Sequence, residues 1–461
     1  MAMADSLRQR IITLCALYAA QGVPGGFMAQ AVVSYLTERG INDEQAGDLS
    51  AIILLPWTFK LIWAPLIDSA TIRSMGRRRP WIIGAELMMA VTLLGLLMMG
   101  DLTQDLRMLG FMFFLHNCFA SLQDVCTDAL AIDVLPHAEQ GSANGLMWGS
   151  KLAGKGFGAF VMAWVMSQSD VWGLQAAVML QFVFLMLVML FPLLILERQG
   201  EKRFPWSKGA AVETGPVSST RNPLQVVKEL LRGFSLPATL SFALFGVTKL
   251  IGSGVNEVVT KTLYTQPLEW NAVDFSKVDG LYGIVPGVFG AVAGGYLANR
   301  FGRRKIIIFG FGGYSLVALV FAACPHLWNE RWFTAGFLLV TQGFVAVGSV
   351  GFLSMAMRIT WTKSAATMFT VYMTLSNIGH VVGNKFAGTV RELYKEPVFN
   401  LAFFQNQAEW ITAYQQTFAF VAIASLLPLL FLPLVDPMGV DVFKYPRVEE
   451  TDVSELAEGA T

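Results

Sequence analysis

Long apolar runs recur from one end of this chain to the other, and they constrain its fold more than any other feature. A helix needs ~20 apolar residues to cross the ~30 Å hydrocarbon core of a bilayer. Of the 461 residues, 54% are hydrophobic and 14% are charged, whereas soluble domains carry about 25% charged residues. The sequence therefore predicts an all-α integral membrane protein.

Run length and apolarity predict about twelve transmembrane helices. Their expected limits are 11–36, 45–67, 80–100, 107–134, 142–168, 172–196, 236–264, 276–298, 306–324, 331–357, 364–391 and 411–435. The formal net charge of +0 argues against nucleic acid as a partner. The four cysteines have no paired spacing, so they indicate neither a disulfide framework nor a metal site.

Basic residues alternate between connections, and this alternation predicts the topology. Arginine clusters at 77–79 and 303–304 fall on one side, while the opposite connections hold about one basic residue each. By the positive-inside rule, both termini are then cytoplasmic. A polar stretch rich in Gly, Pro and Ser divides the chain. We therefore expect a first half at 1–196, a cytoplasmic linker at 197–235, a second half at 236–435 and a cytoplasmic tail at 436–461.

A repeated loop pattern supports two six-helix, pseudo-symmetric halves. Each copy places a short polar side chain before a Gly-Arg-Arg turn, and the glycine relieves the turn sterically. The residues of these two candidate gating loops are Asp68, Gly76, Arg77 and Arg78 in the first copy and Asn299, Arg300, Gly302, Arg303 and Arg304 in the second. Two such halves suit a transporter that rocks about a central site.

The run from Leu109 to Leu135 carries two carboxylates inside the membrane. Asp124 and Asp128 are four residues apart, so they share one helix face. A carboxylate at this depth costs roughly 2.5–3.5 kcal/mol and should face a bundle interior or a wet cavity. This helix face either lines a translocation path, or its carboxylates are neutralised by lysines and serve only to assemble the bundle. We favour the translocation path.

Further charged and polar side chains fall within predicted spans. Lys151 and Lys155 share a face of the fifth span, either as a wall that attracts anions or as internal salt bridges. The candidates for solute binding or proton coupling are Asp124, Asp128, Lys60, Lys151, Lys155, Lys249, Asn256, Glu257 and Lys261. Lys60 is expected either to pair with Asp124 or Asp128 or to have a purely structural role. Glu257 with Lys261 is either a gate or packing ion pair or a coupling or substrate site. Glu86, His380 and Lys385 are additional candidates.

The two Gly-Arg-Arg loops resemble those of the major facilitator superfamily. The copy from Gly295 to Arg304 matches its G-x-x-x-D-R-x-G-R-R pattern, with Asn299 in place of Asp. KLIWAPLID (60–68), GRRRPW (76–81) and LQDVCTDALAIDVLP (122–136) are similar to the muropeptide permease and acetyl-CoA transporter family within it. One departure is that Ile251, Gly252 and Ser253 follow Lys249-Leu250, where muropeptide permeases tend to have an acidic residue.

The resemblance implies a secondary transporter of the bacterial inner membrane. It implies proton-coupled import of a polar peptide-like or glycopeptide solute, such as an anhydro-muropeptide, with a siderophore or peptide-like metabolite as the alternative. We expect a monomer whose partners are the lipid bilayer, a small-molecule solute and protons, with no cofactor. A membrane-embedded enzyme is disfavoured because the four histidines are scattered, and a passive channel remains the other alternative.

Overall fold

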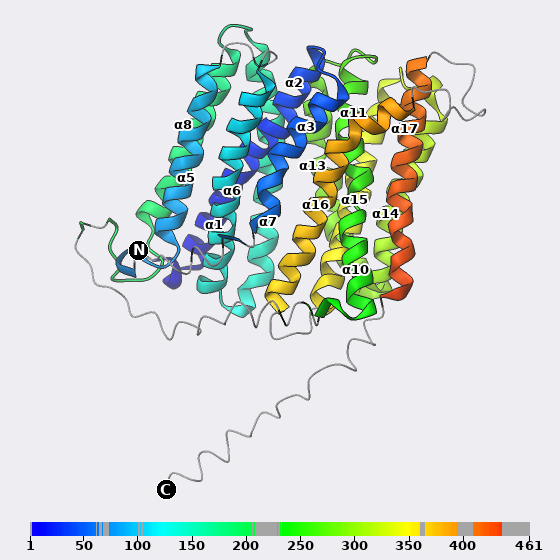
Figure 1. The fold of residues 1–461 in the computed structure, drawn as a ribbon. Helices are drawn as coiled ribbons and strands as arrows, with labels where there is room; N and C mark the ends of the chain where they lie inside the picture. The colour runs from blue at the N-terminus through cyan, green and yellow to red at the C-terminus, as the bar shows by residue number, and fades with distance from the viewer. Residues whose placement is uncertain are drawn as a thin grey trace, which may run out of the picture.

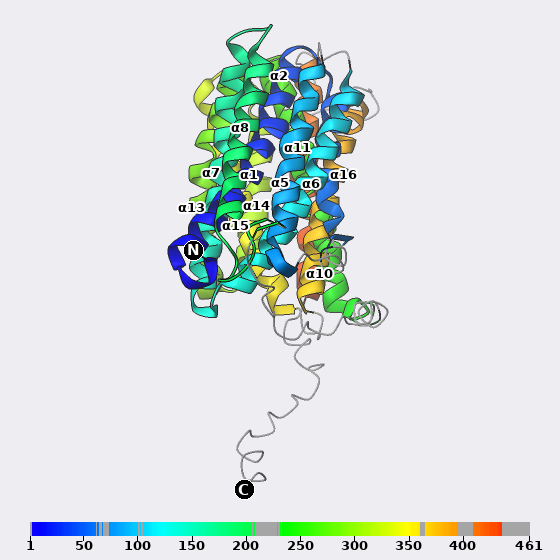
Figure 2. The same cartoon turned by 90° about the vertical axis from the view of Figure 1, so that its left-hand side faces the viewer.

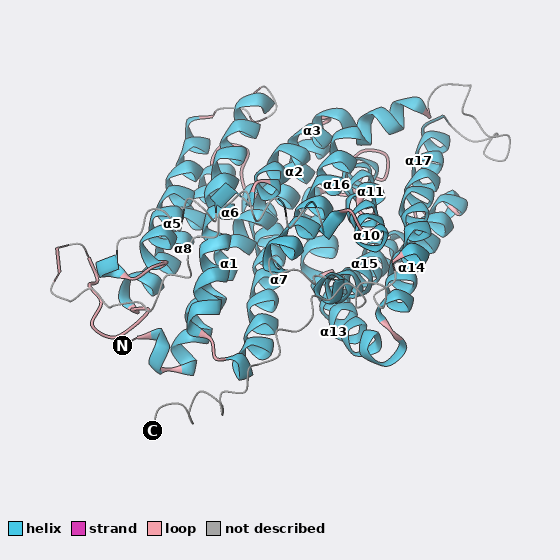
Figure 3. Ribbon diagram, turned by 60° about the horizontal axis from the view of Figure 1, so that its bottom comes forward, coloured by secondary structure: helices cyan, strands magenta, loops and turns pink. Residues whose placement is uncertain are grey.

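The computed structural model describes residues 2–60, 62–63, 67, 73–99, 102, 105–204, 206–207, 228, 231, 233–359, 365–394 and 409–435. Long helices run side by side from one face of the molecule to the other (Figures 1 and 2). Among the described residues there is no β-strand, only one isolated bridge between Ala2 and Leu196 (Figure 3). The predicted all-α class is confirmed.

The helices up to residue 194 form one group, on the left in Figure 1. They are α1 (Leu7–Gly26), η2 (Phe27–Val32), α2 (Val33–Glu38), α3 (Asp43–Leu54), η3 (Leu55–Thr58), α5 (Arg79–Leu94), η5 (Gly95–Met98), α6 (Leu106–Val134), α7 (His137–Ser167) and α8 (Gly173–Leu194). We call this set the first group.

The helices from residue 237 onward form the second group, on the right in Figure 1. They are α10 (Pro237–Thr248), α11 (Ile251–Thr265), α12 (Ala272–Phe275), η6 (Ser276–Tyr282), α13 (Ile284–Phe301), α14 (Arg303–Ala323), α15 (Arg331–Ile359), α16 (Ala365–Leu393), α17 (Glu409–Leu426) and η10 (Leu427–Leu434). The division into halves and the limits of the linker and tail stay predictions.

Within the described residues, eight helical runs are both long and apolar enough to cross a membrane. Three further helices, α6, α7 and α16, have 29, 31 and 29 residues, which is also enough length. Their composition is more polar, and α6 and α7 carry Asp124, Asp128, Lys151 and Lys155. The remaining predicted span, 45–67, begins as α3 and η3, and much of its end lies outside the described residues.

Helical irregularities occur in three predicted spans, 11–36, 236–264 and 276–298. The span predicted at 236–264 consists of two helices, α10 and α11, separated at Lys249 and Leu250. The span predicted at 276–298 begins with the π-helical segment η6, and a second π-helical segment, η2, follows α1. Such segments are frequent at functional sites, and apolar periodicity does not predict them.

Close backbone contacts hold α7 against its neighbours. A Cβ on Gly158 would lie 2.0 Å from the carbonyl oxygen of Val23 in α1. On another side of α7, a Cβ on Gly156 would lie 2.2 Å from Ile284, and one on Gly280 would lie 2.5 Å from the Ala159 methyl. Small residues are what allows helices to approach this closely in a membrane. α7 therefore packs tightly both on α1 and on η6 and α13 of the second group.

Candidate functional site

Asp124 of α6 lies between two lysines from other segments. The Lys60 ammonium contacts Oδ2, and the Lys151 ammonium of α7 lies 3.3 Å from Oδ1. The Asp124 side chain is 4% exposed, while each lysine side chain is 22% exposed. Two ammonium groups thus neutralise a buried carboxylate and remain partly reachable from outside the protein. Of the two partners expected for Lys60, the structure selects Asp124.

Asp128 has a different environment, although it lies only one turn along the same helix. Its side chain is exposed, and Oδ1 accepts a hydrogen bond of 2.5 Å from the Tyr18 hydroxyl of α1. Within the described part of the chain, no lysine or arginine lies within ion-pair distance of it. The two carboxylates therefore differ: one is locked in an ion-pair cluster, and the other is exposed and bound by a phenol. Nothing in the sequence pattern indicated Tyr18.

Aromatic rings form one wall of this cluster. The Trp57 ring centroid lies 4.7 Å from Lys60 Nζ and 4.5 Å from Lys151 Nζ. The Trp57 indole donates to Asn117 at 3.4 Å, and the Trp63 indole donates to Ser121 at 2.9 Å. A tryptophan face attracts cations, so Trp57 helps to hold both ammonium groups beside Asp124.

A second charged cluster lies on α11 and α16. The Glu257 carboxylate is 3.0 Å from the Lys261 ammonium and 2.9 Å from His380 Nε2. Asn256, next to it in sequence, accepts a hydrogen bond of 3.2 Å from Thr260. The structure thus brings Glu257 and Lys261 together and adds His380.

Lys155 and Asp279 extend this second cluster toward the first group. Lys155 of α7 is exposed and close enough to act electrostatically on both Glu257 and Asp279. Asp279 lies on η6 and accepts a hydrogen bond of 3.2 Å from Gln342 of α15. Asp279 is not distinguished by the sequence pattern, because it stands among polar residues at the start of a predicted span.

Lys249 lies apart from both clusters. It is 2% exposed, at the break between α10 and α11. Its ammonium lies 4.3 Å from the Phe352 ring centroid and 5.3 Å from that of Phe311. Among the described residues no carboxylate lies within ion-pair distance. The helix breaks at Lys249, so this lysine does not lie on the same continuous helix as Asn256 and Glu257.

The first Gly-Arg-Arg loop is fastened to the end of α8. Gly76 has φ +99°, and the Glu197 carboxylate accepts hydrogen bonds from the backbone N–H groups of Arg77, Arg78 and Arg79 at 3.0, 2.7 and 2.5 Å. Burial raises the pKa of Glu197. The Arg78 side chain also lies 3.3 Å from Asp133 at the end of α6.

The second loop has the same left-handed glycine but different partners. Gly302 has φ +94°, Arg303 donates to Ser354 at 2.7 Å, and Arg304 donates to the Leu432 carbonyl at 3.0 Å. Arg300 lies 5.6 Å from the Phe301 ring centroid. Asp68 and the side chain of Asn299 lie outside the described residues.

The two groups are joined at the face opposite the Gly-Arg-Arg loops. Asp43 of α3 accepts a hydrogen bond from Thr262 of α11 and lies 3.2 Å from the guanidinium of Arg391 on α16. That guanidinium lies 3.6 Å from the Tyr414 ring centroid. Gln266 donates to the carbonyl of Ile41 at 2.8 Å. We call this set of contacts the Asp43 junction.

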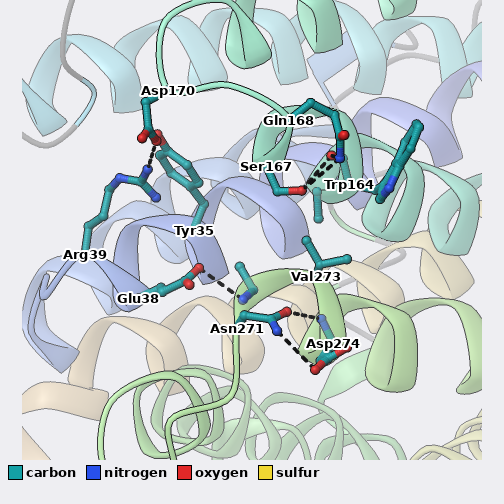
Figure 4. Close-up of a pocket in the computed structure, with 12 residues that line it drawn as sticks. Tyr35, Glu38, Arg39, Trp164, Ser167, Gln168, Asp170, Asn271, Val273 and Asp274 are labelled. Atoms are coloured by element: carbon teal, nitrogen blue, oxygen red, sulfur yellow. Dashed lines mark hydrogen bonds and ion pairs between the residues drawn. The ribbon is translucent and has the colours of Figure 1, made fainter.

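A cavity of about 480 Å³ lies between the two groups, at the ends of α2 and α7 and beside α12 (Figure 4). Arg39 and Asp170 pair across it at 2.5 Å, and Glu38 accepts the backbone N–H of Ala272 at 3.1 Å. Trp164 and Gln168 form another part of its lining. None of the site residues predicted from the sequence lines it.

A bundle of membrane-crossing helices with paired charges inside defines a multi-pass membrane protein, and the family and relatives that it matches make it a transporter rather than an enzyme. The chain belongs to the Major Facilitator Superfamily, whose model matches residues 11–384. It is 25% identical over 450 residues to an anhydromuropeptide permease of Escherichia coli (strain K12), covering 95% of this chain and 81% of that one. It is 22% identical over 390 residues to a putative transporter, AmpG 4, of Rickettsia conorii (strain ATCC VR-613 / Malish 7), and this match covers 82% of this chain and 89% of that one.

Solved transporter structures share the fold. A bacterial homologue of the human lysosomal transporter Spinster, in an inward-facing and unoccupied conformation, superposes with a TM-score of 0.66 at 14% identity and covers 96% of this chain and 100% of its own. The predicted superfamily is confirmed.

Proposed function

We propose that this protein is a proton symporter that imports a polar peptide-like or glycopeptide solute, such as an anhydro-muropeptide, across the bacterial inner membrane. The cluster of Lys60, Asp124 and Lys151 carries the proposal, because it offers two partly exposed cations to an anionic solute. The name of the Escherichia coli relative supports the solute class. The Gly-Arg-Arg loops then lie on the cytoplasmic face, together with both termini, and the monomer is the transporting unit.

Solute binding would exchange one anion for another at the lysines. Breaking a buried ion pair by removing one partner costs about 3–5 kcal/mol. A solute carboxylate or other anion that takes the place of Asp124 at Lys151 avoids this cost. An uncharged solute does not, so the cluster favours anionic solutes.

Asp128 is the residue that we propose carries the proton. It is exposed and bound by a neutral hydroxyl, whereas Asp124 is held by two ammonium groups. Protonation of Asp128 leaves the lysine cluster intact, so the proton and the solute can be bound at the same time. Lys155 and Glu257 are proposed to contact the solute from the other side, and the buried Lys261 is proposed to hold Glu257 in place.

The Asp43 junction is the proposed closed periplasmic gate. It ties the two groups together at the face opposite the Gly-Arg-Arg loops. The structure is then that of an inward-facing carrier, and the inward-facing homologue with the same fold supports this interpretation.

Uptake of labelled anhydro-muropeptide and of a ferric siderophore, in cells with and without the protein, tests the function. We expect accumulation of the muropeptide that a proton ionophore abolishes. Asp128→Asn should transport solute only down its gradient, while Asp124→Asn should impair binding itself. Flux that is indifferent to the ionophore would indicate a passive channel, and uptake of the siderophore alone would refute the proposed solute.

A further inference from the structure

A line of buried polar side chains leads from the lysine cluster to Glu86, a carboxyl group on α5 that the transport cycle proposed above does not use. The Lys151 ammonium donates to Gln21 Oε1 at 2.8 Å, and Gln21 Nε2 donates to Gln123 Oε1 at 2.6 Å. Gln123 Nε2 then donates to Glu86 Oε1 at 2.9 Å. We call Gln21, Gln123 and Glu86 the polar relay.

All three relay residues are buried. Gln21 is 4% exposed, and Gln123 and Glu86 are 0% exposed. Burying a polar group costs free energy unless it is hydrogen-bonded, so three such side chains in a membrane helix bundle need a reason. Glu86 needs it most, because its Oε2 atom has no hydrogen-bond partner among the described residues.

The relay has one direction. Carboxylate and carbonyl oxygens accept, so Glu86 Oε1 and the Leu17 carbonyl, 3.2 Å from Gln123 Nε2, together fix which end of the Gln123 amide carries NH₂. The oxygen of Gln123 must then face Gln21, whose own NH₂ group it accepts. The oxygen of Gln21 is left to face Lys151. The acceptor at one end thus determines that the lysine at the other end meets an acceptor and not a second donor.

We propose that Glu86 is a positioning residue for transport: through Gln123 and Gln21 it sets the orientation of the Lys151 ammonium beside Asp124. Without Glu86, the Gln123 amide keeps only its longer hydrogen bond to the Leu17 carbonyl, so it can turn its NH₂ group toward Gln21 more easily. Gln21 would then present NH₂ to Lys151, and the ammonium would move off Asp124. This inference rests on the proposed function, since it assigns the relay to the same solute and proton site.

The consequence is a change in pH dependence. The charged groups around Asp124 are Lys60, Lys151 and Asp128, and Glu86 acts on them only through the relay. When Lys151 moves away, the charge of Asp124 is neutralised less completely, so Asp128, one turn along α6, holds its proton more tightly. Proton-driven uptake should then persist to a higher pH, by about one pH unit, which matches the loss of one hydrogen bond to a charged group.

Four variants of the full-length protein in vesicles test this proposal, with uptake of labelled anhydro-muropeptide measured against pH. Glu86→Leu and Gln123→Leu should both shift the profile upward, and the double variant should shift it no further. Glu86→Gln keeps an acceptor oxygen and should restore the wild-type profile. Gln181→Leu is the matched control, because Gln181 is also 0% exposed but donates only to the Ala177 carbonyl within its own helix.

Three outcomes would overturn the proposal. They are a wild-type profile in Glu86→Leu, a shift in Glu86→Leu that Gln123→Leu lacks, and an equal shift in Gln181→Leu. A second readout is the pH dependence of thermal unfolding of the purified protein in detergent, which needs neither solute nor gradient. It should separate Glu86→Leu from wild type even if uptake proves independent of protons. Uptake that ignores the gradient in wild type would refute the proposed function, while unchanged unfolding in Glu86→Leu would refute the relay.

Discussion

The Asp43 junction allows a quantitative prediction about which face of the protein opens. Asp43→Asn removes the ion pair to Arg391 but keeps an oxygen that can accept from Thr262. Each side chain of the pair is 13% exposed. Exposed ion pairs contribute about 0.2–1 kcal/mol, and breaking a buried one costs about 3–5 kcal/mol. A pair at this degree of burial should contribute about 2 kcal/mol, or roughly a 30-fold change in the ratio of closed to open forms.

Cysteine labelling from outside the cell measures this ratio. Ala387 of α16 is 0% exposed and lies against Gly47 of α3, so Ala387→Cys reports opening between the two groups. In a background without the four native cysteines, Asp43→Asn should raise the rate of modification by an impermeant maleimide up to roughly 30-fold. Asp274→Asn is the control, because its pair with Arg331 is exposed and lies within the second group. Equal rates in Asp43→Asn and its parent would refute the gate.

Three further predictions concern stability. Gly158→Leu places a side chain against the Val23 carbonyl and should prevent folding. A Cβ at Gly145 meets nothing within 4 Å, so Gly145→Ala should stabilise the helix by about 0.5–1 kcal/mol. Fluorescence-detected size-exclusion chromatography distinguishes the two outcomes. Burial raises the pKa of Glu197 above its ordinary value of 4.5. The folded state therefore holds this proton more tightly than the unfolded state, and stability should fall as the pH rises from the unfolded-state pKa through the folded-state pKa. Glu197→Gln should flatten that dependence in thermal unfolding. Lys249→Met removes a buried cation without a carboxylate partner among the described residues and should raise the unfolding free energy by about 1–4 kcal/mol; a lower melting temperature would indicate a missed partner.

The charged stripe of α6 could be predicted because a helix fixes the spacing of its own side chains. Asp124 and Asp128 had to share a face, and a carboxylate in a membrane helix had to avoid lipid. Their unequal surroundings could not be predicted. They depend on which residues of α1 and α7 lie opposite, and Tyr18 and Lys151 are far from α6 in sequence.

The sequence did not predict the helix break at Lys249 or the hydrogen bonds that Glu197 accepts from the first Gly-Arg-Arg loop, and the reasons differ. Apolar residues continue on both sides of Lys249 and Leu250, so the sequence pattern predicts one continuous helix where the structure has two. Glu197 stands at the start of a polar stretch whose composition is that of a linker. Its role depends on a left-handed glycine, Gly76, that brings three N–H groups to one carboxylate.

The contact between α7 and η6 has a consequence for the speed of the carrier. Gly280 meets the Ala159 methyl there, and the Ile284 side chain lies against Gly156, which has no side chain of its own. If long side chains interlocked at this contact, they would have to change rotamer before one group could rotate against the other. Glycine and alanine at the contact avoid that step. The contact between α7 and η6 can therefore let the first and second groups rotate against each other. A bulky residue in this contact would slow turnover whichever way the carrier faces.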